Sequence, residues 1–368
     1  MRAHSIDRLS IIFSAILIIL GILILSSVSA ALSQERFGYP YYYLAHQLIY
    51  GLIPGLILAF FTLRIPLTFF KKIAFPLFLI NLLILGLIFI PQIGIRLGGA
   101  SRWISLGPIS LQPAEFLKIT FLLYLAAWLS SWSDSTQLKT KRRSNMPLVV
   151  FFVLLAILGA LLILQPNIGT LSVIFIVSSL VYFGSGTPVW HSILIVLIGI
   201  SGLISLIKIA PYRMSRLMVF FNPEMDPLGK GYQIKQALIA IGSGGIFGLG
   251  LGLSRQKFGF LPQSMEDSVF AIFAEEGGFI GAVILIVLFL FFIWRSFIIS
   301  KRSSDKFSKL LALGISSWIG IQAFVNMGAM VRILPLTGIP LPFISYGGSH
   351  LIAELIGIGL LLNISKNT

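Results

Sequence analysis

Carboxylates gather in residues 258–278, FGFLPQSMEDSVFAIFAEEGG, at the entrance to a long apolar run. Glu266 and Asp267 stand just before that run, and Glu275 and Glu276 lie about two helical turns further along. Acids are costly inside lipid, so acids in such a position indicate a functional site by default. Counting 3.6 residues per turn from Asp267 places Glu275 on the same helix face, among small residues. This pattern predicts a polar cleft, not a lipid-facing surface.

Two interpretations of Asp267 remain open from its position alone. A carboxylate beside a cavity can accept a proton as a general base. An Asp directly before a helix is also a favoured N-cap, because its charge complements the helix dipole. The adjacent Glu266 can share the role of base. For Glu275 and Glu276 we expect a structural or positioning role.

The composition excludes a soluble globular protein, because 57% of the 368 residues are hydrophobic and 11% are charged. Each run of about 20 apolar residues can cross the hydrocarbon layer as a helix. We therefore predict an all-α polytopic membrane protein of about ten transmembrane helices, forming a single integral-membrane domain over 1–368. The predicted spans are 9–32, 44–63, 73–93, 113–132, 147–165, 168–183, 189–209, 268–294, 310–330 and 349–364. No internal repeat is visible, which argues against transporters built from inverted repeats.

The basic residues predict the orientation. An even number of spans puts both termini on one side, and the segments on that side carry 15 of the 27 Lys and Arg residues. Short cytoplasmic loops are rich in Lys and Arg, so we expect cytoplasmic termini and an extracytoplasmic loop at about 210–267. The net charge of +15 is not gathered into a patch interleaved with aromatic residues, so nucleic acid is not an expected partner. The chain has no cysteine, which excludes disulfides and thiol chemistry.

Basic residues on the extracytoplasmic segments have the chemistry to hold an anion. Arg102, in GASRWISLG, can pair with a phosphate or carboxylate, or can snorkel beside an aromatic interface. Lys118 lies three residues after Glu115, near enough for an ion pair within the membrane. The long loop carries cations that would form a positive rim suited to a pyrophosphate: Arg213, Arg216, Lys230, Lys235, Arg255 and Lys257.

Two further segments have unusual backbone composition. The Gly-rich run 237–252 is too apolar for a solvated loop and too broken for a span, so it predicts a re-entrant or interfacial segment packed on protein. The segment 334–349, LPLTGIPLPFISYGGS, can form a rigid lid over a cavity or a simple helix-breaking turn. For His191 and His350 we expect ordinary polar lining.

Several motifs together are similar to those of a known family. They are GASRWISLG with QPAEFLK, QPNIGT, GYQIKQALIAIGSGGIFGLGLGLSRQKFGFLP, DSVFAIFAEE, and NMG followed by LPLTGIPLPFISYGGS. These motifs resemble the SEDS family of FtsW and RodA polymerases over all the predicted spans in the same order, and its division branch more than its elongation branch. The resemblance implies a peptidoglycan glycosyltransferase that polymerises lipid II at the outer face of the bacterial cytoplasmic membrane during cell division.

The resemblance also implies roles for particular residues. One Asp at the end of the long outward loop is essential in that family, and Asp267 occupies its position. We expect Asp267 to be the general base for the acceptor 4-hydroxyl in an inverting transfer, and Glu115 to join Glu275 and Glu276 in positioning. The sequence departs from the family pattern at Gln263, at Asn167 and in the pair Met265 and Glu266, which leaves Asp267 intact. The expected substrate-binding residues are Arg102, Lys118, Arg213, Arg216, Lys257, Ser345 and Ser349.

The implied chemistry sets the expected cofactors and partners. Nothing in the sequence has metal-ligand spacing, and a divalent cation, Mg or Mn, is the one cofactor that a diphosphate would accommodate. The expected partners are lipid II, a polyprenyl-diphosphate-linked glycan, membrane lipid, an FtsI-like class B penicillin-binding transpeptidase and other divisome membrane proteins at the septum. A lipid II flippase and a proton-coupled secondary transporter remain alternative functions, because both need a helix bundle with a polar cleft.

Overall fold

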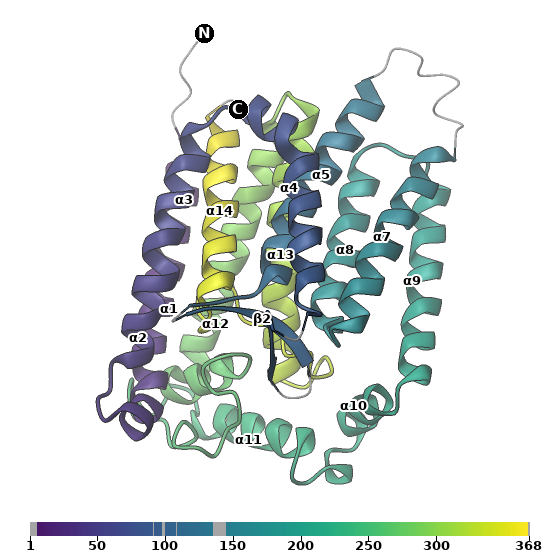
Figure 1. Cartoon of the computed structure of the whole chain (residues 1–368). Coiled ribbons are helices and arrows are strands. Elements are labelled where there is room, and N and C mark those ends of the chain that lie inside the picture. The colour runs from purple at the N-terminus through teal and green to yellow at the C-terminus, as the bar shows by residue number, and fades with distance from the viewer. Residues whose placement is uncertain (1–5, 91, 98–99, 108, 135–144, 367–368) are drawn as a thin grey trace.

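The protein is a bundle of long apolar helices with a small sheet and short helices at one end (Figure 1). The computed structural model describes residues 6–90, 92–97, 100–107, 109–134 and 145–366. The basic segment 139–143, which enters the orientation argument, lies outside the described residues. Helix α1 begins and α14 ends on the same side of the molecule, and we call the opposite side, which carries β2, α10 and α11, the loop side (Figure 1).

Within the described chain, nine helices are long and apolar enough to cross a membrane, and a shorter apolar helix, α8, adds to them. This confirms the predicted mostly helical, multi-span fold class. The long helices are α1 (Arg8–Phe37), Tyr42–Arg64 (α2 Tyr42–Gln47, the π-helical turn η1 Leu48–Leu52 and α3 Ile53–Arg64), α4 (Leu67–Leu87), α5 (Pro113–Asp134), α7 (Met146–Leu164), α9 (Val189–Ile209), α12 (Val269–Arg302), α13 (Lys306–Met330) and α14 (Gly348–Ser365). Helix α8 spans Ile168–Gly184.

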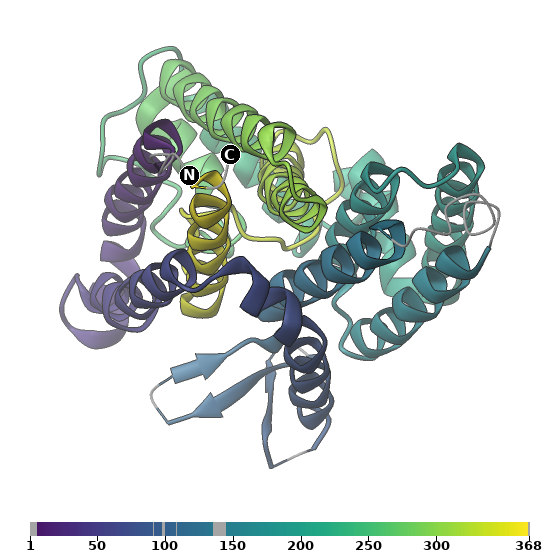
Figure 2. The ribbon, with the colours of Figure 1, turned by 90° about the horizontal axis from the view of Figure 1, so that it is seen from above.

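The bundle is packed around its C-terminal helices. Helices α14, α13 and α5 are the most buried of the long helices, whereas α9 is the least buried. Viewed from above, α14 stands between α1, α3 and α12, while α7, α8 and α9 form a group to one side (Figure 2). Exposed apolar side chains cover the outer helices, as expected where lipid is the solvent; examples are Phe60, Leu83, Ile193 and Leu197.

A three-stranded antiparallel sheet joins α4 to α5 on the loop side. Its strands are β1 (Gly94–Leu97), β2 (Ala100–Leu106) and β3 (Ile109–Leu111), in the order β1-β2-β3. Ile95 pairs with Trp103, and Ser105 pairs with Ser110. The sequence analysis did not predict these strands, because their motif lies between two apolar runs and its glycines suggested only a break in the helix. The sheet carries Arg102 on its central strand.

The segment between α9 and α12 folds into short helices and turns on the loop side (Figure 1). It contains α10 (Pro211–Phe221), the 3₁₀ turn η2 (Pro223–Met225) and α11 (Lys230–Ser243). The glycine-rich residues that follow α11 pack against α12 where that helix is interrupted at Gly278, whose φ of 65° and ψ of −169° are not helical. Backbone bonds from Leu249 to Glu275 and from Gly250 to Glu276, both 3.0 Å, fix this contact.

Candidate active site

Asp267 lies on the loop side in a tight turn that immediately precedes α12. Helix α12 begins at Val269 with Ser268 at the N-cap position, so Asp267 stands one residue before the cap. Its side chain accepts a hydrogen bond from Gln233 in place of capping the helix. The helical count from Asp267 therefore does not apply, and the Glu275 carboxylate is bonded instead to the backbone nitrogens of Arg255 and Gln256 at 3.1 and 3.3 Å.

The turn that carries Asp267 is held by the proline-rich segment before α14 and by α13. Asn326 Nδ2 donates to the carbonyl oxygens of Asp267 and Ile339, both at 2.8 Å. The backbone nitrogen of Tyr346 donates to Met265 at 2.8 Å, and Ser345 Oγ donates to the carbonyl of Glu266. These bonds come from two elements far away in sequence, so the position of the acid is set by tertiary structure.

The carboxylate of Asp267 is buried and oriented by an amide. Its side chain is only 7% exposed. Gln233 Nε2 lies 3.3 Å from Asp267 Oδ1, and Gln233 Oε1 accepts from Lys230 Nζ at 3.1 Å. Because an ammonium group can only donate, Lys230 fixes which end of the Gln233 amide faces the acid. The second oxygen, Oδ2, is turned toward Gly338, where an added Cβ would lie 3.8 Å from it.

Burial and charge act on this acid in opposite directions. Burial raises the pKa of Asp267, because desolvation disfavours the ionised form, while the positive charges of Lys230 and Arg216 and the Gln233 hydrogen bond oppose the rise. The pKa of Glu266 is also raised, because the surrounding protein partly desolvates its carboxyl group and because the charge of Asp267 is close. The Glu266 residue is nevertheless exposed at the surface. A carboxylate with a raised pKa is a better proton acceptor once it is ionised.

Two arginines extend the positive charge around Asp267. Burial and the nearby charge of Arg216 lower the pKa of Arg102, so these two guanidinium groups lie in the same region. Arg102 donates to the carbonyls of Gln165 at 3.2 Å and Pro166 at 2.5 Å, which ties the sheet to the turn between α7 and α8. Asp267 thus lies in the same region as three cations, Arg102, Arg216 and Lys230. Such cations suit a phosphate group.

Other predicted substrate-binding residues make contacts within the protein. Arg213 donates to the Tyr212 hydroxyl at 3.0 Å and to the carbonyl of Leu206 at 2.9 Å, at the end of α9. Lys257 is buried, and its ammonium group lies 3.0 Å from Glu276. Glu276 also accepts from Ser27 on α1, and Ser254 Oγ donates to Glu275, so these two acids join the glycine-rich segment to the bundle.

The two predicted serines bind backbone groups next to the site. Ser345 accepts from the nitrogen of Leu341 at 2.8 Å in addition to its bond to Glu266. Ser349 accepts from the nitrogen of Gln112 at 3.0 Å and donates to the carbonyl of Ser110 at 3.3 Å. Ser345 therefore braces the turn of Asp267, while Ser349 braces the sheet.

Lys118 lies inside the bundle in a buried polar network. Its ammonium group is 2.8 Å from Glu115 and 2.7 Å from Gln322 Oε1. His350 is 3.2 Å from both Glu115 and Glu354, and all of these side chains are buried. Gln322 also donates to Pro340 at 3.2 Å, and Glu354 accepts from the nitrogen of Phe343 at 2.8 Å. The network thus supports the proline-rich segment that holds Asp267.

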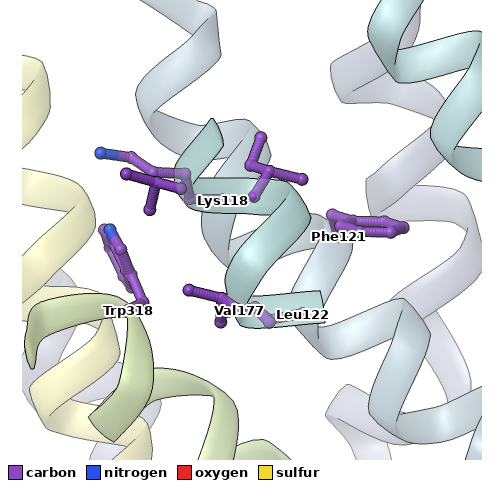
Figure 3. A pocket seen from close by; sticks show the side chains of 7 residues that line it. Lys118, Phe121, Leu122, Val177 and Trp318 are labelled. Atoms are coloured by element: carbon purple, nitrogen blue, oxygen red, sulfur yellow. The ribbon is translucent and has the colours of Figure 1, made fainter. Parts of the chain in front are cut away.

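A small apolar pocket lies beside this network, between α5, α8 and α13. Figure 3 shows Phe121, Leu122, Val177 and Trp318 around it, with the ammonium end of Lys118 directed away from Phe121. Trp318 donates to Gln322 at 2.8 Å and lies 5.1 Å below the Lys118 ammonium. The apolar wall and the paired Lys118 give this pocket no group for acid–base chemistry.

Gln233 was missed by the sequence analysis, and Lys230 was named only as part of the positive rim. An amide carries no charge, so Gln233 gave no signal by composition. Its spacing of three residues from Lys230 on α11 was the available clue, because residues i and i+3 share a helix face. Gly338 was not singled out within the proline-rich segment.

The chain matches the family model for FtsW, RodA and SpoVE, described as a cell cycle protein, over residues 7–368. The chain belongs to the FtsW/RodA/SpoVE family. It is 40% identical to the probable peptidoglycan glycosyltransferase FtsW of Coxiella burnetii over 367 residues, which cover 99% of this chain and 97% of that protein.

Solved structures of this family have the same fold. A chain of a peptidoglycan synthase complex that coordinates polymerization and crosslinking superposes with a TM-score of 0.78 at 29% identity, covering 98% of both chains. The rod shape determining protein RodA of Thermus thermophilus superposes with a TM-score of 0.70 at 28% identity, covering 98% of this chain and 97% of that one. Both solved chains are thus similar to this chain over almost their full length.

Proposed function

We propose that the chain is a peptidoglycan glycosyltransferase that polymerises lipid II into glycan strands, with Asp267 as general base. The observation that carries this proposal is the buried carboxylate of Asp267, oriented by Gln233 and influenced by the positive charges of Lys230 and Arg216. Family membership supports the reaction, since the Coxiella relative is named for it. The bundle lies in the bacterial cytoplasmic membrane, with its termini in the cytoplasm and its loop side facing outward.

The reaction joins a sugar hydroxyl to an anomeric carbon that already carries a good leaving group. The oxygen of the acceptor 4-hydroxyl attacks the anomeric carbon of the donor, and its proton passes to Asp267. The bond from that carbon to the diphosphate oxygen breaks, and the electron pair leaves with the polyprenyl diphosphate. Attack from the opposite face converts an α-linked donor into a β-linked product. Arg102, Arg216 and Lys230 stabilise the departing negative charge.

A divalent cation on a diphosphate takes one or two carboxylates from the protein, and phosphate oxygens and water supply its other ligands. Among the described residues, no group of three or more His, Cys, Asp or Glu side chains that could hold a metal ion is found. Glu266 and Asp267 alone do not make such a set. In the proposed reaction, the protein's own cations neutralise the diphosphate, and a divalent cation held by Glu266 or Asp267 would share that charge.

The proposed setting is cell division at the septum. Identity of 40% to the FtsW relative supports the division branch. The similarity to a chain of a peptidoglycan synthase complex supports a crosslinking partner, and we propose a class B penicillin-binding transpeptidase together with other divisome membrane proteins.

The test is polymerisation of lipid II by Asp267→Asn and Asp267→Ala, each purified with the transpeptidase partner. Loss of a general base lowers the rate by a factor of about 10² to 10⁴. Glu224→Gln is the matched control, because Glu224 is an exposed acid on the same side, paired with Lys235. Glu266→Gln measures whether the neighbouring acid shares the role.

Both Asp267 variants should fold and still bind lipid II. An unchanged rate in either variant contradicts the assignment of the base. Movement of lipid II between leaflets without polymer would favour a flippase, and proton-coupled uptake of a solute would favour a secondary transporter.

A further inference from the structure

Aromatic rings form a continuous series on the loop side next to the turn of Asp267. The rings of Tyr346 and His46 are 5.9 Å apart, those of His46 and Tyr42 are 6.2 Å apart, and those of Tyr42 and Tyr39 are 6.2 Å apart. We call Tyr346, His46, Tyr42 and Tyr39 the aromatic track. Tyr43 packs against Tyr346 at 5.3 Å, and Phe37 stacks on Tyr42 at 3.6 Å and covers one face of that ring.

One end of the aromatic track is attached to the candidate active site. Tyr346 is bonded to Met265, two residues before Asp267, and its hydroxyl lies 2.9 Å from His46 Nδ1. Desolvation and the nearby groups Tyr43, Tyr42 and Glu266 raise the pKa of Tyr346, so the Glu266 carboxylate lies within electrostatic range of the track. The other end is open, because Tyr39 is 48% exposed.

The aromatic track lies beyond the hydrocarbon layer. Helix α1 has 30 residues and is therefore about 45 Å long, whereas the hydrocarbon layer is about 30 Å thick. Its apolar run ends at Leu32, and the polar residues Gln34, Glu35 and Arg36 follow before the chain turns at Gly38. A polar, aqueous level suits a hydrophilic ligand better than a lipid tail.

The aromatic track and the cations flank the acid from different directions. Helix α2, which carries Tyr42 and His46, lies at one end of the loop side, and α10, which carries Arg216, lies at the other, with α11 between them (Figure 1). A pyranose ring has one apolar C–H face that stacks on an aromatic ring, and hydroxyls at its edge that bond to Tyr and His side chains. The cations suit the diphosphate, which leaves the aromatic track to the sugar.

We propose that the aromatic track binds the saccharide strand as it grows away from the active site. This inference rests on the proposed function, since it assigns a subsite to the product of that reaction. The ring series gives the strand a path from Asp267 to the edge of the molecule. A strand held there stays bound between successive additions, so the track sets how long strands become.

The binding test uses the Asp267→Ala variant, in which no strand is made. The probe is a soluble β-1,4-linked N-acetylglucosamine oligosaccharide, followed by saturation-transfer NMR and titration of the protein in nanodiscs. Tyr39→Ala and Tyr42→Ala should each weaken binding by roughly two- to tenfold, the size of one ring contact. Tyr42→Phe keeps the ring and should bind more tightly than Tyr42→Ala.

Phe247→Ala is the matched control, because Phe247 is an 81% exposed ring on the loop side outside the track. With Asp267 intact, Tyr39→Ala and Tyr42→Ala should give shorter strands from lipid II, and Phe247→Ala should not. Should Tyr42→Ala misfold, the exposed Tyr39 decides the outcome. The proposal is overturned if the oligosaccharide fails to bind, or if Tyr39→Ala binds it as tightly as the control and yields strands of full length. An active Asp267→Ala enzyme would instead contradict the proposed function, whatever the oligosaccharide does.

Discussion

At the scale of single residues, the candidate site depends on how three side chains meet. Lys230 orients Gln233, and Gln233 donates to Asp267, while burial raises the pKa of the acid. A buried carboxylate needs such partners, because desolvation alone would leave it protonated. Burial therefore makes the Asp267 carboxylate a stronger proton acceptor, while Lys230 and Gln233 favour its ionised form.

This balance predicts a pH shift in Lys230→Met. Lys230 favours the ionised form of Asp267, so removing its charge should raise the pKa of the acid further. Since only the ionised acid accepts a proton, the acid limb of the kcat/KM profile should move to higher pH. Lys235→Met is the control on the same helix, since Lys235 pairs with the exposed Glu224. A rate that falls equally at every pH, with the limb unmoved, would indicate a purely structural role for Lys230.

Sequence reasoning identified Asp267 and the cations but not their partners. The acid stands out because charge is rare in an apolar chain. Gln233, Asn326 and Gly338 act through tertiary contacts between elements far apart in sequence, and no local pattern encodes those contacts. Lys118 was expected to bind substrate, yet Glu115 and Gln322 occupy its ammonium group inside the bundle.

At the scale of elements, α12 and the glycine-rich segment hold each other in place. Gly278 has a backbone conformation that only glycine adopts easily, and a Cβ there would lie 2.2 Å from the nitrogen of Gly248. Glu276, next to this break, holds the buried Lys257. Helical periodicity gave no indication of the break, because the residues on both sides read as one apolar run. The sheet was missed because its motif lies between two apolar runs and its glycines suggested only a break in the helix.

Gly278→Ala should lower the stability of the fold by about 1–3 kcal/mol, because alanine is strained in this backbone conformation and would also meet Gly248. Gly277→Ala provides a neighbouring control, as the nearest atom to its added Cβ is 3.5 Å away. Thermal unfolding in detergent measures both variants. Equal unfolding midpoints for the two would show that the break in α12 is not required by packing.

At the scale of the whole molecule, the side of the termini is closed by contacts among α1, α12 and α14. Arg295 on α12 lies 2.5 Å from Asp7, and the nitrogen of Asp7 donates to Ser365 at 3.1 Å. Although burial alone would raise it, the pKa of Asp7 is lowered by hydrogen bonds from Arg295 and Ser10. The overall multi-span architecture was predictable because the membrane imposes it on any chain with this composition, whereas closures of this kind depend on tertiary packing.

A lowered pKa in the folded state means that the Asp7 contact stabilises the protein above the ordinary aspartate pKa of about 4. That stability is lost as the pH falls through the lower folded-state value. Arg295→Ala should therefore reduce the unfolding midpoint at neutral pH, and the difference from wild type should shrink in acid. Arg302→Ala, an exposed cation about two turns further along α12, is the control. A difference that persists undiminished in strong acid would contradict this account.

The interruption of α12 at Gly278 has a mechanical consequence. Helix α12 is the longest helix, and the break divides it into two parts. A neighbour in the bilayer that tilts the 24 residues from Phe279 to Arg302 therefore does not tilt the turn before Val269 by the same amount. Beyond the break, the backbone nitrogens of Phe279 and Ile280 donate to the carbonyls of Gly245 and Ile246 at 2.9 and 3.1 Å, so this part of α12 is attached to the glycine-rich segment. A partner protein bound to this part of α12 would thus act on the turn of Asp267 through the glycine-rich segment.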